Sequence, residues 1–130
     1  MRYMLLIYLN ERALDEAERA ACSRESIQLA HELRVAGQYL DAAPLQSVST
    51  AASVRVRDGR RLVTDGPFAE TREQLGGFFM IEAADLDEAI LVAERIPMAK
   101  RGIVEVRPVI EIPGLPARAQ DAALAPPVKA

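Results

Sequence analysis

Two short segments of the chain are apolar at nearly every position. They cover residues 3–9 (YMLLIYL) and residues 75–81 (LGGFFMI). Because successive side chains of a strand point to opposite faces, each run predicts an interior strand that is covered on both sides. Gly76 and Gly77 lie inside the second run, where glycine favours a bend or the close approach of another segment. Both runs are therefore expected to form central strands.

Two further segments alternate between apolar and charged residues. Residues 54–57 (VRVR) place valines on one face and arginines on the other, and residues 104–107 (VEVR) do likewise before Pro108. Proline has no amide proton to donate to a neighbouring strand, as a strand in the centre of a sheet must. The later segment is therefore predicted to be an edge strand. Asp58 and Gly59 form the strongest short signal for a two-residue turn. The sequence thus predicts a β-hairpin over residues 53–64.

Helical periodicity occurs twice along the chain. A long helix is predicted over residues 12–36, with Gly37 as its stop. Its apolar stripe consists of Cys22, Ser26, Leu29, Leu33 and Ala36. A second helix is predicted to begin after Asp85, whose side chain can cap the first turn together with Glu88, and to end before Pro97. Its stripe consists of Leu86, Ala89, Ile90 and Ala93.

The order of these elements predicts an α+β fold. Strand, helix, strands with a hairpin, strand, helix and strand follow the ferredoxin-like β-α-β-β-α-β plan with an inserted β-hairpin. This domain spans residues 1–112, and the Pro/Ala-rich residues 113–130 are expected to form a flexible C-terminal tail. Two helices can cover only one face of the sheet. The other apolar face is therefore expected to pack against a second copy, giving a homodimer.

The composition of the chain limits the classes of molecule with which it is expected to interact. The chain has 130 residues, a formal net charge of −3 and one cysteine, Cys22. A lone cysteine forms no disulfide within the chain, which is typical of a cytoplasmic protein, and it is expected to pack as a small apolar residue. No segment reaches the ~20 apolar residues of a membrane helix, so no membrane partner is expected. The acidic balance argues against nucleic acid as a partner.

The segment Thr64 to Phe68 (TDGPF) is the most distinctive candidate site. A carboxylate at Asp65 beside apolar surface could act as a catalytic acid or base. Alternatively, the segment is a turn in which Asp65 bonds to backbone amides and Phe68 fills the core. For a ligand site around Asp65, the candidate binding residues are Gly66, Pro67, Phe68, Phe78 and Arg57.

Other polar residues are weaker candidates. Four arginines concentrate on the predicted hairpin, namely Arg55, Arg57, Arg60 and Arg61. They could bind an anionic ligand or an acidic protein, or they could discourage edge-to-edge aggregation. His31 lies opposite the helix stripe, between Ile27 and Val35, and is expected to face solvent or an interface. We find no metal-ligand spacing, no phosphate-binding loop and no dinucleotide fingerprint, so no metal or cofactor is expected.

Five segments together resemble the DGPF branch of the YCII-related family. They are residues 64–71 (TDGPFAET), 73–78 (EQLGGF), 3–7 (YMLLI), 84–89 (ADLDEA) and 104–108 (VEVRP). The resemblance covers residues 1–112 and implies a dimeric α+β barrel. In parts of the broader family a His–Asp pair is proposed for acid–base chemistry. Asp65 lies in a matching motif, but the histidine position corresponds to a place near Ser26, and serine cannot accept protons near neutral pH.

Two functions follow as hypotheses. The first is a homodimeric protein that binds a small molecule, or an acid–base enzyme, with a cleft near Asp65. The second is a regulatory module that partners an extracytoplasmic-function sigma factor, because proteins that this chain resembles are often encoded near or fused to such factors. The basic hairpin and the C-terminal tail favour the second hypothesis, and the motif around Asp65 beside aromatic residues favours the first. The sequence leaves both open.

Overall fold

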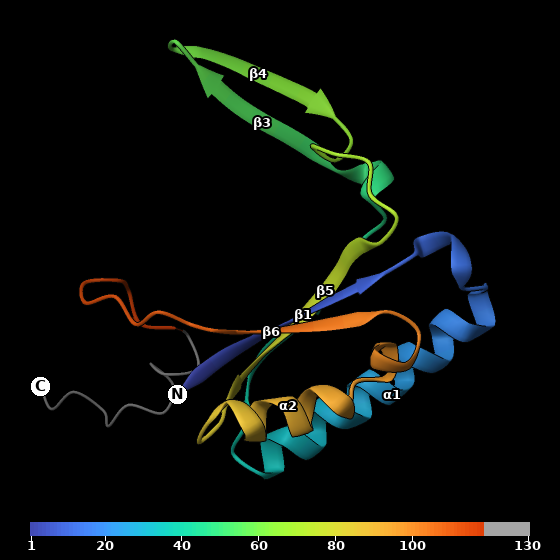
Figure 1. Ribbon diagram of the computed structural model, residues 1–130, viewed down its shortest axis with the longest axis vertical. Coiled ribbons are helices and arrows are strands. Elements are labelled where there is room, and N and C mark those ends of the chain that lie inside the picture. The colour runs from blue at the N-terminus through green and yellow to red at the C-terminus, as the bar shows by residue number, and fades with distance from the viewer. Residues whose placement is uncertain (119–130) are drawn as a thin grey trace, which may run out of the picture.

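The computed structural model describes residues 1–118 and contains a four-stranded sheet, a separate two-stranded sheet and two α-helices (Figure 1). The strands are β1 (Arg2–Leu9), β2 (Tyr39–Pro44), β3 (Ala52–Arg57), β4 (Arg60–Asp65), β5 (Gln74–Glu82) and β6 (Ile103–Pro108). The helices are α1 (Glu16–Val35) and α2 (Leu86–Glu94), with 3-10 turns η1 (Glu11–Ala13), η2 (Val48–Thr50) and η3 (Pro97–Lys100). These elements confirm the α+β class. Residues 119–130 of the predicted tail lie outside the described residues.

The larger sheet is antiparallel throughout, with the strand order β2-β5-β1-β6. Strands β1 and β5 are interior and β6 is an edge strand, as their apolar and alternating patterns predicted. The bounds of β2 had no marker in the sequence. This strand, YLDAAP, is short, mixes small and polar residues, and ends at Pro44 on the other edge of the sheet. Proline is tolerated at such an edge because no further strand needs its amide.

The paired glycines of β5 allow the close approach that the sequence suggested. The register of β1 against β5 shifts beside Gly76, which is left out of the ladder as a bulge. A Cβ atom on Gly77 would lie 2.8 Å from the carbonyl oxygen of Ala43 in β2. Glycine at position 77 therefore lets β2 reach its hydrogen-bonding position beside β5.

The first helix begins four residues later than the periodicity predicted. Asp15 caps it by accepting a hydrogen bond from the Glu18 amide at 2.8 Å, while Asn10 caps the separate turn η1 before it. These two caps divide the predicted segment because a helix begins where a side chain satisfies its free amides. At the other end Gly37 adopts φ 75°, and the Gln38 amide bonds to the Leu33 carbonyl at 2.8 Å. The predicted stop is confirmed.

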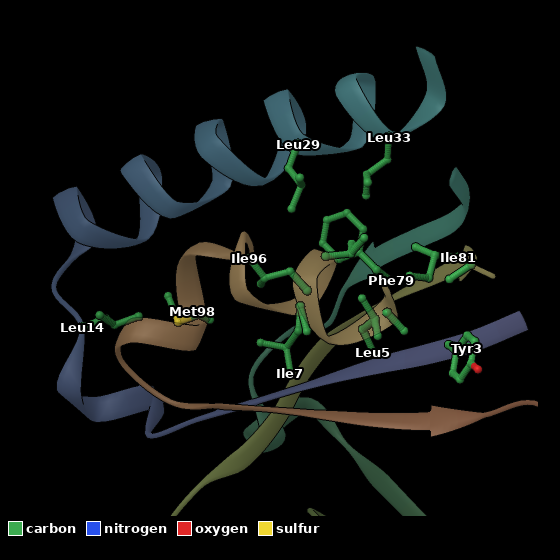
Figure 2. Packing of buried hydrophobic residues seen from close by; sticks show 14 residues of the cluster. Tyr3, Leu5, Ile7, Leu14, Leu29, Leu33, Phe79, Ile81, Ile96 and Met98 are labelled. Carbon is green, nitrogen blue, oxygen red and sulfur yellow. The ribbon is translucent and has the colours of Figure 1, made fainter. Parts of the chain in front are cut away.

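The core lies between one face of the larger sheet and both helices (Figure 1). Leu29 and Leu33 of α1 point toward Phe79 of β5 (Figure 2). The predicted stripe of α2 is partly wrong, since Leu86 and Ile90 are 47% and 40% exposed. The buried residues of α2 are instead Ala89, Val92 and Ala93. Packing on the sheet turns the helix toward its Val92 side, which helical periodicity alone could not select.

The opposite face of the sheet has no helix over it in the described part of the chain (Figure 1). Tyr3, Leu5 and Ile7 of β1 are buried on the helix side, so the alternate residues of the strand point to the other side. The side chains there on the two interior strands are half-buried and mostly apolar, and they include Met4, Leu6, Tyr8, Phe78 and Met80. We call this surface the open face.

Strands β3 and β4 form the predicted hairpin, which extends above the sheet in Figure 1 while the helices lie below it. Its turn residues Asp58 and Gly59 have φ values of 52° and 73°, as the two-residue turn requires. Cross-strand partners point to the same face, and successive residues of each strand point to opposite faces. The hairpin therefore has two faces of different composition. The valine face carries Val54, Val56, Arg61 and Val63. The arginine face carries Arg55, Arg57, Arg60 and Leu62.

Candidate functional site

An open cavity of about 800 Å³, lined mostly by polar residues, lies where β1 ends and β5 begins. Its walls come from three parts of the chain that are far apart in sequence: residues 10–19, residues 47–49 and residues 67–74. The third wall is the second half of the distinctive motif and the residues after it. The cavity therefore adjoins the segment that sequence analysis singled out.

Glu11 holds two walls of the cavity together. Its Oε2 accepts a hydrogen bond from the Ser47 hydroxyl at 2.9 Å, and its Oε1 accepts one from the Val48 amide at 3.0 Å. The carbonyl oxygen of Glu11 accepts a further hydrogen bond from the Arg19 guanidinium. One residue thus links η1 to η2 and to the first turns of α1.

Gln74 attaches the third wall. Its side-chain Oε1 accepts a hydrogen bond from the Glu11 amide at 3.1 Å, and its Nε2 donates to the Thr71 carbonyl at 2.5 Å. The Thr71 hydroxyl in turn donates to the Glu73 carbonyl at 2.5 Å. These bonds tie the segment that follows the motif to the end of β1. The geometry of the cavity therefore depends on a connected polar network.

The cavity is lined by three arginines and two glutamates. The cations are Arg12, Arg19 and Arg72, and the anions are Glu11 and Glu70. The Glu11 carboxylate already accepts two hydrogen bonds from neutral donors, and within residues 1–118 neither Arg12 nor Arg72 pairs its guanidinium with a carboxylate. Free guanidinium groups at a concave surface can bind carboxylate or phosphate oxygens.

The turn of the motif is held by its neighbours in the hairpin. Gly66 adopts φ 96°, its amide bonds to the Ala51 carbonyl at 2.6 Å, and its carbonyl accepts from the Ser53 hydroxyl at 2.9 Å. The Asp65 carboxylate ends β4, is exposed, and makes no hydrogen bond to another described residue. Phe68 is 88% exposed, so the interpretation in which it fills the core is wrong.

A single chain does not gather all of the predicted site residues. Of these residues, Pro67 lines the cavity, whereas Asp65, Gly66, Phe68, Phe78 and Arg57 do not. Arg57 and Arg60 are cross-strand neighbours at the tip of the hairpin. Asp65 lies at the base of the hairpin, five residues after Arg60 along β4. At the rise of an antiparallel strand this separates the two ends by about 17 Å. Phe78 lies elsewhere, on the open face.

Two further residues have the surroundings that the sequence indicated. His31 is exposed on α1, on the side away from the core. Cys22 is partly buried and packs against the core cluster. Burial raises the pKa of the Cys22 thiol, and the nearby Arg101 charge only partly opposes this shift. Such a thiol is a poor nucleophile, consistent with a packing role.

Sequence reasoning missed the polar residues that build the cavity, above all Glu11, Gln74 and the three arginines. One signal was available. Charged and amide residues cluster directly after the first apolar run (NER, residues 10–12) and directly before the second (REQ, residues 72–74). Because the two runs form adjacent antiparallel strands, the end of one meets the start of the other. The two clusters therefore had to lie together.

This chain is similar to a known protein family and to a known protein. Residues 1–113 match the YCII-related domain. An uncharacterized protein of Rhizobium meliloti is 37% identical over 115 residues, which cover 83% of this chain and 91% of the relative. Within residues 1–118, no helix is long and apolar enough to cross a membrane.

Proposed function

Because this chain belongs to the YCII-related family, we propose that it is a homodimeric protein that binds a small anionic molecule in the cavity beside the Asp-Gly-Pro-Phe motif. The observation that carries the proposal is the cavity of about 800 Å³ with three arginines in its walls. A volume in this range is typical of small-molecule sites.

The charges of the lining favour an anion. Three arginines and two glutamates leave a net lining charge of +1. The Glu11 carboxylate is occupied by Ser47 and Val48, so its ability to neutralise the arginines is reduced. The planar guanidinium groups of Arg12 and Arg72 suit the paired oxygens of a carboxylate or a phosphate. They take the anion-binding role that the sequence assigned to Arg57.

Asp65 keeps a candidate acid–base role in this proposal. Its carboxylate is exposed and free of hydrogen bonds within the described part of the chain, and it lies two residues before Pro67 in the cavity wall. A bound ligand that extends toward the base of the hairpin would meet this group. In an acid–base enzyme with this site, the Asp65 carboxylate would donate a proton to the ligand or accept one from it.

Homodimerisation is the second part of the proposal. The strand order β2-β5-β1-β6 and the placement of both helices on one face support the ferredoxin-like plan. The open face is apolar at Leu6 and Phe78, and a second copy packed on it by two-fold symmetry would complete a dimeric α+β barrel. Sedimentation at micromolar concentration should then find a dimer. Leu6→Lys should produce monomers, whereas Ile27→Lys on the exposed side of α1 should not.

Binding can be tested with defined anions. Titration calorimetry with inorganic phosphate, succinate and benzoate is expected to find binding of at least one of them. Arg72→Gln should weaken that binding about tenfold, the loss of ~1.4 kcal/mol. The matched control is Arg24→Gln, which removes an exposed arginine of α1 outside the cavity and should leave affinity unchanged. Absence of binding for all three anions, together with no co-purified small molecule in native mass spectrometry, would refute the proposed function.

A protein partner is a second candidate function. The arginine face of the hairpin is exposed, and its guanidinium groups have no carboxylate partner among the described residues. Such a surface fits an acidic protein, and an extracytoplasmic-function sigma factor remains our candidate. Pull-down from the native host should recover the partner with the natural chain and lose it with Arg57→Glu. Equal recovery with Arg57→Glu would show that the arginine face does not bind it.

A further inference from the structure

The hairpin stands apart from the other elements of residues 1–118. Strands β3 and β4 pair with each other and with no strand of the larger sheet. Nevertheless the hairpin carries four exposed apolar side chains, namely Val54, Val56, Leu62 and Val63. A lone two-stranded hairpin is at best marginally stable in water, so a hairpin of this composition is expected to pack against another surface.

The direction of the hairpin points to that surface. In Figure 1 it rises from the sheet on the side opposite the helices, which is the side of the open face. The hairpin and the open face thus lie on the same side of the molecule. A protein chain packed on the open face would therefore lie beside the hairpin.

The two surfaces also match in charge. On the open face Glu105 of β6 lies opposite Leu6, Arg107 of β6 lies opposite Met4, and Asp41 of β2 lies opposite Met80, so charges of both signs flank an apolar centre. On the valine face Arg61 lies opposite Val56, and Asp65 lies opposite Ala52. Each surface thus has an apolar centre with both a guanidinium and a carboxylate beside it, so that opposite charges can meet when the two surfaces pack together. Such a pattern suits two copies of the same chain.

We propose that the hairpin is an arm that packs its valine face against the second copy of the chain. The inference rests on the proposed dimer and adds the contact that secures it. Two-fold symmetry makes the contact reciprocal, so each dimer has two such arms. The arginine face then points outward on each arm, where it stays available to an acidic partner.

Adjacent residues of β4 give a matched test. Leu62 and Val63 are 52% and 49% exposed and point to opposite faces of the hairpin. Val63→Arg is expected to raise the dimer dissociation constant about 100-fold, tenfold for each of two arms, as measured by sedimentation equilibrium. Leu62→Arg carries the same change on the arginine face and should leave the constant within about threefold of the natural value. Equal changes of the dissociation constant in the two variants, or no change in Val63→Arg, would refute the proposal that the valine face contacts the second copy.

A second measurement does not depend on a variant. Amide hydrogen exchange of residues 52–65 should slow when the concentration of the full chain is raised through the dimer dissociation constant, while exchange in α2 stays the same. Unchanged exchange in the hairpin of a proven dimer would refute the arm and leave the dimer standing. A natural chain that sediments as a monomer at micromolar concentration would refute the dimer and the arm together.

Discussion

Replacement of Glu11 by alanine tests the polar network that shapes the cavity. The carboxylate accepts one hydrogen bond from the Ser47 hydroxyl at 2.9 Å and one from the Val48 amide at 3.0 Å. Both donors belong to the start of η2, and Glu11 follows β1. Glu11→Ala therefore releases η2 from the end of the sheet, while the backbone contacts of Glu11 to Gln74 and Arg19 can remain.

The magnitude follows from the exposure of the donors. A hydrogen bond to a charged group contributes about 1.5–3 kcal/mol when it is shielded from water. The Ser47 bond is exposed and the Val48 bond is partly buried, so water replaces part of what is lost. We expect Glu11→Ala to lower the free energy of unfolding by ~1–2 kcal/mol. For a domain of this size that corresponds to a fall in Tm of roughly 3–8 °C.

The assay compares Glu11→Ala with Glu25→Ala in urea and thermal unfolding followed by circular dichroism. Glu25 is an exposed glutamate in the middle of α1, and its replacement should change stability by less than about 0.5 kcal/mol. Amide exchange at Val48 should rise in Glu11→Ala and stay constant in the control. If the two variants unfold alike and Val48 remains protected, the carboxylate does not hold η2, and the network needs another explanation.

Further outcomes are expected at Gly77, Leu5 and Cys22. Gly77→Ala should cost ~1–3 kcal/mol in urea unfolding, because its Cβ would meet the rigid Ala43 carbonyl, whereas Gly76→Ala meets only a movable leucine side chain and should cost less. Leu5→Ala, at a site with 0% exposure, should cost ~2.5–5 kcal/mol in the same assay. The folded protein should be alkylated by iodoacetamide more slowly than its urea-unfolded form at the same pH, because burial raises the pKa of Cys22 and the folded state holds the thiol proton more tightly. The stability from this group is complete below its unfolded-state pKa and is lost as the pH rises through the folded-state value, so Cys22→Ala should flatten the alkaline decline in stability.

Local patterns determined those elements whose cause lies within a few neighbouring residues. Asp58 and Gly59 specify the hairpin because their positive φ values fit its turn. Gly37 ends α1 for a similar reason, and Asp85 begins α2 by accepting from the Glu88 amide at 2.9 Å. The two apolar runs marked β1 and β5 as interior strands, because burial on both faces leaves no position for a charge.

Packing between distant segments decided the rest. Leu86 and Ile90 fit helical periodicity as well as the buried residues do, and only contact with the sheet selected Val92 instead. Phe68 is a large aromatic residue, yet no element within residues 1–118 lies over it and it stays exposed. The cavity brings together residues 10–19, 47–49 and 67–74, and its hydrogen bonds cross up to 63 positions of sequence. The ends of the two apolar runs indicate only that residues 10–12 and 72–74 meet, whereas residues 47–49 join them only when the strands have found their register.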